Sequence, residues 1–101
     1  MKNLLEKDFE SAVKQAEQPV VLKFTADWWP ACRQLAPVVG AVSEELTNVD
    51  FYSVDVDQAP GIAQQFGVMS IPTMILFKGG EEAERVVGYM PEDAVKEFAS
   101  K

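Results

Sequence analysis

The chemistry-bearing part of this sequence is a short segment that ends in its only cysteine. The segment is Trp28-Trp29-Pro30-Ala31-Cys32, and it joins an apolar, β-branched run to a stretch with helical periodicity. A thiol near the amino terminus of a helix can act as a thiolate nucleophile in disulfide exchange, because the helix end favours negative charge. The alternative is an inert cysteine that packs as a small apolar side chain. A lone cysteine excludes any disulfide within the chain.

The composition narrows the kinds of function that this thiol could serve. With 101 residues, the chain is long enough for one hydrophobic core and too short for two, which predicts a single domain over residues 1–101. Its 9 basic and 16 acidic residues give a formal charge of -7, which repels phosphate backbones and anionic bilayers. We therefore expect no nucleic-acid partner and no membrane partner.

Two further features of the sequence bear on cofactors and on cellular location. They are the absence of histidine and the short apolar stretch at the amino terminus. Without histidine, the chain lacks the commonest zinc ligand and the commonest general base, so no metal and no other cofactor is expected. Apolar character at the amino terminus stops after Leu4-Leu5, which is too short for a signal-peptide core or a membrane span. A cytoplasmic location is the resulting expectation.

The elements that must position Cys32 follow from hydrophobic periodicity. An almost unbroken apolar run predicts a strand over residues 20–24 that is covered on both faces. Apolar residues at helical spacing predict a long helix over residues 31–46, which Pro30 opens and Pro37 should kink. Cys32 is then expected at the corner between this strand and this helix.

The remaining elements complete an alternating order. After Asp8 as N-cap, an amphipathic helix is predicted over residues 9–17, and Gly79-Gly80 predicts a hairpin turn. Other elements are expected at residues 2–5 (edge strand), 49–56 (strand), 59–66 (helix), 74–78 (strand), 84–88 (return strand) and 91–100 (helix). Crossovers followed by a hairpin predict an α/β fold, with a mixed central β-sheet flanked by helices on both faces.

Four motifs, taken with this element order, resemble the thioredoxin family across nearly the whole chain. Each motif alone is weak, and their order and spacing together are specific. They are Phe24-Thr25-Ala26-Asp27-Trp28, Val56-Asp57-Gln58-Ala59-Pro60-Gly61, Ile71-Pro72-Thr73, and Phe77-Lys78-Gly79-Gly80 with Gly88 beyond. The resemblance implies a thioredoxin-like fold and a role in reducing the disulfides of client proteins, with electrons from a thioredoxin reductase.

The resemblance also implies which residues do the chemistry, and the chain departs from the family at the first of them. In thioredoxins, the first cysteine of Cys-x-x-Cys attacks a client disulfide and the second resolves the mixed disulfide. The matching positions here are Trp29 and Cys32, and an indole has no nucleophilic anion near neutral pH. The resolving-type thiol is therefore retained without the attacking one.

The same resemblance implies a peptide-binding groove beside Cys32. Pro72 would be the family's cis-proline, which leaves the adjoining backbone free to pair with an extended client peptide. From the residues alone, Trp28 is expected to pack beneath the site loop, and Trp29 to be a surface aromatic that marks a binding face. The residues expected to contact a client are Trp28, Trp29, Pro30, Ile71, Pro72 and Gly88.

Lys23 is a second departure, because it lies where the family usually keeps a buried aspartate beneath the second cysteine. An ammonium beside a thiol favours the thiolate, whereas apolar surroundings would make Lys23 neutral. The usual lysine partner of that aspartate is also replaced, by Ser53. Our hypothesis is that Lys23 stabilises a Cys32 thiolate.

Three functions are compatible with these residues. The favoured one is a thioredoxin impaired in dithiol chemistry, in which Cys32 at most forms a mixed disulfide with glutathione, a client or a second copy of the chain. The alternative is a redox-inactive module that holds extended peptides or another partner. In the third, Trp29 is a designed replacement in an ordinary reductase, so that a cysteine restored there would give insulin-reducing activity.

Overall fold

The computed structural model describes residues 1–101 and contains one mixed five-stranded sheet. The strand order is β1-β3-β2-β4-β5, in which β3 lies parallel to β1 and β2, while β4 is antiparallel to β2 and β5. The strands are β1 (Lys2–Asn3), β2 (Val20–Thr25), β3 (Asp50–Asp55), β4 (Thr73–Lys78) and β5 (Glu81–Val87). The predicted mixed sheet is confirmed.

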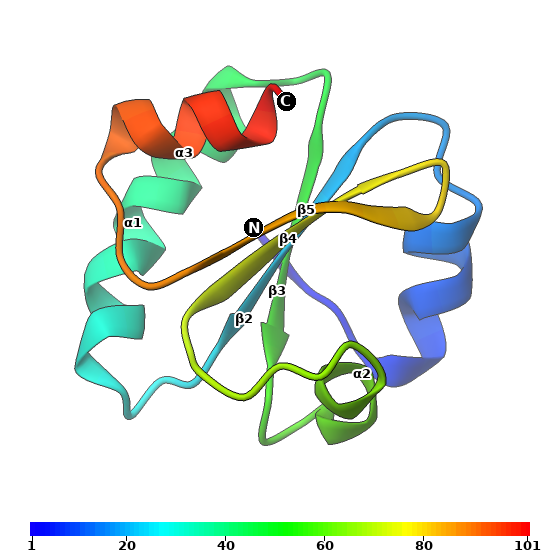
Figure 1. Ribbon diagram of the computed structural model, residues 1–101, viewed down its shortest axis with the longest axis horizontal. Helices are drawn as coiled ribbons and strands as arrows, with labels where there is room; N and C mark the ends of the chain where they lie inside the picture. The colour runs from blue at the N-terminus through cyan, green and yellow to red at the C-terminus, as the bar shows by residue number, and fades with distance from the viewer.

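Helices cover both faces of this sheet, as Figure 1 shows. On one face lie η1 (Glu6–Asp8), η2 (Glu10–Lys14) and α2 (Pro60–Gln65); on the other lie α1 (Pro30–Glu45) and α3 (Glu92–Ala99). Two hydrophobic cores result. The first includes Phe9, Leu22 and Ile62, and the second includes Leu35 and Val95. Val20, Leu22 and Phe24 of β2 belong to the first core and Val21 belongs to the second. Both faces of this strand are covered, and all six of its residues are buried.

The predicted helix over residues 9–17 is wrong in its extent and geometry. The chain forms a short 3-10 turn, η1, followed by a π-helical turn, η2, in which Gln15 N donates to the Glu10 carbonyl at 3.0 Å. Asp8 ends η1, and its carboxylate accepts a hydrogen bond from Leu5 N at 3.2 Å. Apolar spacing places Phe9 inward correctly, but it does not distinguish tight from wide helical turns.

The return strand also starts earlier than predicted, at Glu81 rather than Glu84. Lys78 pairs with Glu81 across the two-residue turn Gly79-Gly80, whose positive φ values of 61° and 81° suit glycine. Six of the seven residues of β5 are exposed and three are glutamates, so the start of the strand has no apolar signal. The predicted helix after Pro30 runs through Pro37 without interruption. None of the helices has the length and apolar composition that a membrane crossing requires.

Candidate functional site

Cys32 lies in the first turn of α1, at the corner where β2 passes into the helix. Trp29 N donates to the Ala26 carbonyl at 3.1 Å, which closes the turn after β2. Cys32 N donates to the Trp29 carbonyl at 3.1 Å, which starts the helix directly after Pro30. The Cys32 side chain points inward, and the residue is only 1% exposed. The only thiol of the chain is therefore covered.

The two tryptophans before Cys32 lie on the surface. Trp28 is 63% exposed and Trp29 is 43% exposed, and their rings meet edge to face with centroids 5.6 Å apart. The indole Nε1 of Trp28 donates to Asp57 Oδ2 at 2.8 Å, which fixes the loop after β2 to the loop after β3. The prediction that Trp28 packs beneath the site loop is therefore wrong. Its aromatic face is presented to solvent instead.

An apolar groove of about 410 Å³ opens beside these tryptophans. Seven of its eight lining residues are hydrophobic, and one of them, Met69, is 95% exposed. An exposed apolar surface of this kind is the usual mark of a binding face. The groove is lined by Trp28, Trp29, Val56, Ala63, Val68, Met69, Ser70 and Ile71.

Unpaired backbone borders this groove at Ile71. The Ile71–Pro72 peptide bond is cis, and neither the N–H nor the carbonyl of Ile71 forms a backbone hydrogen bond. The Pro72 carbonyl, by contrast, is already occupied, because Gly88 N donates to it at 2.8 Å. Gly88 holds this position with a φ of 99°, a value that glycine adopts without strain. The free groups at Ile71 can pair with an extended polypeptide.

A second cavity, of about 230 Å³, lies on the other side of the corner and contains the thiol. Lys23 is 4% exposed, and it is the only buried lysine or arginine of the chain. Its Nζ forms no hydrogen bond and no ion pair with another protein group. The cavity is lined by Lys23, Thr25, Ala26, Asp27, Cys32, Arg33, Ala36 and Ser53.

Burial has the larger effect on the charge of Lys23. Desolvation lowers the pKa of the Lys23 ammonium from its ordinary value of 10.5, and the weaker attractions of Cys32 and Asp27 act in the opposite direction. Of the two effects on Lys23 that the sequence left open, desolvation is thus stronger than attraction to the thiol. The Lys23 ammonium therefore loses its proton more readily than that of an exposed lysine.

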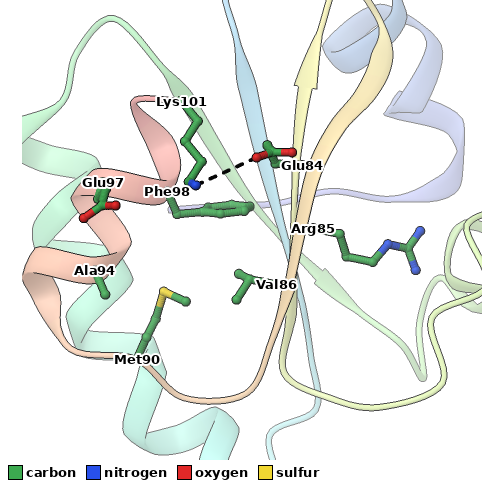
Figure 2. A pocket seen from close by; sticks show the side chains of 8 residues that line it. All are labelled: Glu84, Arg85, Val86, Met90, Ala94, Glu97, Phe98 and Lys101. Atoms are coloured by element: carbon green, nitrogen blue, oxygen red, sulfur yellow. Dashed lines mark ion pairs between the residues drawn. The ribbon is translucent and has the colours of Figure 1, made fainter.

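A third cavity, of about 250 Å³, lies between β5 and α3 and contains no residue of the predicted site. Figure 2 shows Val86, Met90 and Phe98 around it, with the ion pair from Lys101 Nζ to Glu84 Oε1, which is 3.8 Å long, at its edge.

The structure has no group of three or more His, Cys, Asp or Glu side chains that could hold a metal ion.

The predicted site residues thus divide between two hollows. Trp28, Trp29 and Ile71 line the apolar groove, whereas Cys32 and Lys23 line the polar cavity. Pro30 is exposed at the start of α1, and Pro72 and Gly88 are joined by their hydrogen bond.

Sequence reasoning gave no site role to several residues of the polar cavity, among them Thr25 and Arg33. Side chains two apart on a strand share a face, so the position of Lys23 on β2 could have revealed Thr25. Arg33 directly follows Cys32 in the first turn of α1, but sequence proximity alone does not say which way its side chain turns.

Comparisons with known proteins agree with this architecture. A family model described as Thioredoxin matches residues 1–101. The chain is 38% identical over 95 residues to a thioredoxin of Streptomyces clavuligerus, which covers 94% of this chain and 89% of that protein. It is 45% identical over 82 residues to a thioredoxin of Chlamydia muridarum (81% and 80% covered). It is 37% identical over 93 residues to Thioredoxin-2 of Saccharomyces cerevisiae (92% and 89% covered). The chain therefore belongs to the thioredoxin family.

Proposed function

We propose that this chain is a cytoplasmic thioredoxin-family protein that binds extended segments of client proteins but does not turn over their disulfides. Membership of the family supports a redox-related role with client proteins as partners. The proposal rests on one contrast within the site. The apolar groove is open and the Ile71 backbone is unpaired, while the only thiol is 1% exposed and has Trp29 in place of a partner thiol.

Binding in the groove would combine two kinds of contact. An extended polypeptide would pair its backbone with the N–H and carbonyl of Ile71, as a strand does at a sheet edge. Its apolar side chains would cover Trp29 and Met69, which are 43% and 95% exposed. Backbone pairing makes such recognition tolerant of sequence, and the apolar contacts supply most of the affinity.

The absence of dithiol turnover follows from the electron count. Reduction of one client disulfide delivers two electrons, which in the family come from two thiols that end as an internal disulfide. This chain has one cysteine, so an internal disulfide cannot form. Release of a client from a mixed disulfide with Cys32 would need an external thiol.

A titration with an extended client tests the binding. The probe is a fluorescently labelled insulin B chain whose cysteines are alkylated, so that no disulfide exchange contributes. We expect Trp29→Ala and Met69→Ala each to weaken binding by about tenfold, the effect of losing a hot-spot side chain. Leu5→Ala removes an exposed apolar side chain outside the groove and should leave the affinity unchanged. Equal affinity of all four proteins would refute the proposed groove.

A weaker candidate is monothiol chemistry at Cys32, which is favoured by the cavity beside the thiol. In that function, oxidised glutathione or thioredoxin reductase would have to reach Cys32 in the folded protein. Intact mass measured after exposure of the native protein to oxidised glutathione separates the two functions. Our proposal predicts no glutathione adduct until the protein is unfolded, and an adduct on the folded protein would favour the monothiol function.

A further inference from the structure

We propose that the 230 Å³ cavity binds a small oxo acid, with the ligand's carbonyl carbon against the Lys23 amine and its carboxylate against the Arg33 guanidinium. This function is separate from client binding, because neither cation lines the apolar groove. It rests on the placement of the two cations, on their lack of protein partners, and on the size of the cavity.

The first observation is that both cations lack an anionic partner. The ion pairs of the structure involve Arg85, Lys96 and Lys101, and none includes Lys23 or Arg33. Asp27 lines the same cavity but lies beyond ion-pair distance of both. Several exposed lysines also form no ion pair, so what distinguishes Lys23 and Arg33 is the burial of Lys23 and the cavity that both residues line. The arrangement suits an anionic ligand.

The second observation is the depth of Lys23. The residue is 4% exposed, whereas Arg33 and Asp27 are exposed at the rim. Every fully buried side-chain nitrogen has a hydrogen-bond partner. Because Lys23 Nζ has no such partner, it keeps some exposure, and Lys23 lines the cavity. An amine with so little exposure and no protein partner is poorly solvated, and a ligand in the cavity would reduce that cost.

The size and lining of the cavity limit the ligand to a few heavy atoms. An apolar cavity of about 150 Å³ accommodates benzene, so 230 Å³ admits a two- to four-carbon acid. The hydroxyls of Thr25 and Ser53 line the same space and can donate to a carbonyl or carboxylate oxygen. A guanidinium binds a carboxylate through two parallel hydrogen bonds, which assigns the carboxylate to Arg33.

The chemistry at Lys23 is imine formation. The neutral amine attacks the carbonyl carbon, a C–N bond forms, and the carbonyl oxygen takes a proton to give a carbinolamine. Loss of the hydroxyl as water gives the imine, so one amine and one carbonyl yield one imine and one water. No electron is transferred. Buried lysines are suited to this reaction because burial lowers the pKa of the ammonium, as it does here for Lys23.

Reductive trapping of the native protein tests the proposal. The protein is incubated at pH 7 with glyoxylate and cyanoborohydride, and the carboxymethylated lysines are located by peptide mapping over time. We expect Lys23 to be modified at least about tenfold faster than Lys14, an exposed lysine in the same molecule. Lys23→Met should abolish the fast phase and leave the slow one.

A second aldehyde and a second variant test the role assigned to Arg33. Arg33→Gln should slow the trapping of glyoxylate at Lys23 by about fivefold or more, and leave the trapping of acetaldehyde, which has no carboxylate, unchanged. Thermal unfolding of Arg33→Gln checks that the variant is folded. Modification of Lys23 no faster than that of Lys14 would overturn the site. Equal effects of Arg33→Gln on both aldehydes would overturn the oxo-acid assignment.

Discussion

Lys23 combines a buried position with an amine that forms no hydrogen bond and no ion pair with the protein. It lies on β2 between Ser53 of β3 and Met74 of β4, in a sheet whose two faces are covered by helices. Met74 is apolar and Ser53 is neutral, so neither neighbour compensates the charge. The protein therefore retains a side chain that costs stability, which is the pattern expected when a residue serves a function rather than the fold.

The loss of folding stability caused by burying Lys23 should depend on pH. Burial lowers its pKa in the folded state below the ordinary value of 10.5, so the unfolded chain binds more protons between the two values, and stability rises with pH across that window. We expect Lys23→Met to stabilise the protein at pH 7 by about 1–3 kcal/mol. This advantage should shrink as the pH approaches 10.5. Urea unfolding at several pH values measures both effects.

Lys14→Met is the matched control for this experiment, because Lys14 is exposed. Its substitution should change the free energy of unfolding by less than about 0.5 kcal/mol at every pH. A Lys23→Met variant that is less stable than the wild type at pH 7 would show that the ammonium has a stabilising partner. That result would contradict the unpartnered state of Lys23 on which the oxo-acid site depends.

One side-chain hydrogen bond joins the loop between β2 and α1 to the loop after β3. Trp28 Nε1 donates to Asp57 Oδ2 at 2.8 Å, and Asp57 N in turn donates to Asp55 Oδ1 at 2.8 Å. These contacts join the carboxyl ends of β2 and β3 and keep the Trp28 ring at the mouth of the apolar groove. The groove therefore depends on a polar contact outside it.

Loss of this hydrogen bond should lower the free energy of unfolding modestly. It should lower the affinity of the groove for a client more strongly. We expect Asp57→Ala and Trp28→Phe each to lower the free energy of unfolding by about 1 kcal/mol, since the bond is exposed and one partner is charged. The double variant should cost less than the sum, because both changes remove the same bond. Denaturant unfolding of the four proteins measures this coupling. Strictly additive losses would mean that the bond contributes nothing to stability.

Sequence patterns were most reliable for the strands and helices that carry a buried stripe. The strand over residues 20–24 and the helix after Pro30 both occur close to their predicted bounds, because burial on one or two faces leaves a periodic signal. The amino-terminal helix was mispredicted because the buried residues Phe9, between η1 and η2, and Val13, in η2, have helical spacing although the two turns differ in width. The exposed strand β5 has no apolar stripe, so its first residues were missed.

The whole molecule is built around two cores that the sheet separates. Leu22 belongs to the core beneath η2 and α2, and Leu35 belongs to the core beneath α1 and α3. Leu35 also lies one turn beyond Cys32 on α1, so it anchors the helix that positions the thiol. The polar cavity and the apolar groove occur where these helices and loops meet the carboxyl end of β2.

The separation of the cores predicts nearly additive losses of stability. Leu22→Ala and Leu35→Ala should each lower the free energy of unfolding by about 2–5 kcal/mol, the usual cost of a cavity at a fully buried leucine. Their effects should add to within about 0.5 kcal/mol, because the side chains lie on opposite faces of the sheet. Urea unfolding of the single and double variants measures this sum. Strong coupling would show that the sheet transmits repacking between its faces.

The fold and the family were both predictable from the sequence, because four motifs and an element order agree over the whole chain. The site was predictable only in part. The positions of Cys32 and Lys23 beside one cavity follow from the strand-to-helix corner, whereas the exposure of Trp28 depends on its hydrogen bond to Asp57. Contacts between distant loops leave no periodic signal in a single sequence.

In the proposed function, this protein binds clients without turning over their disulfides. The most direct test compares insulin reduction by the wild type and by Trp29→Cys, each in dithiothreitol. A single thiol cannot form the internal disulfide that ends each turnover, so the wild type should match dithiothreitol alone. Trp29→Cys restores the Cys-x-x-Cys spacing with Cys32 and should accelerate the reduction. Steady reduction by the wild type above the dithiothreitol background would contradict the proposed function.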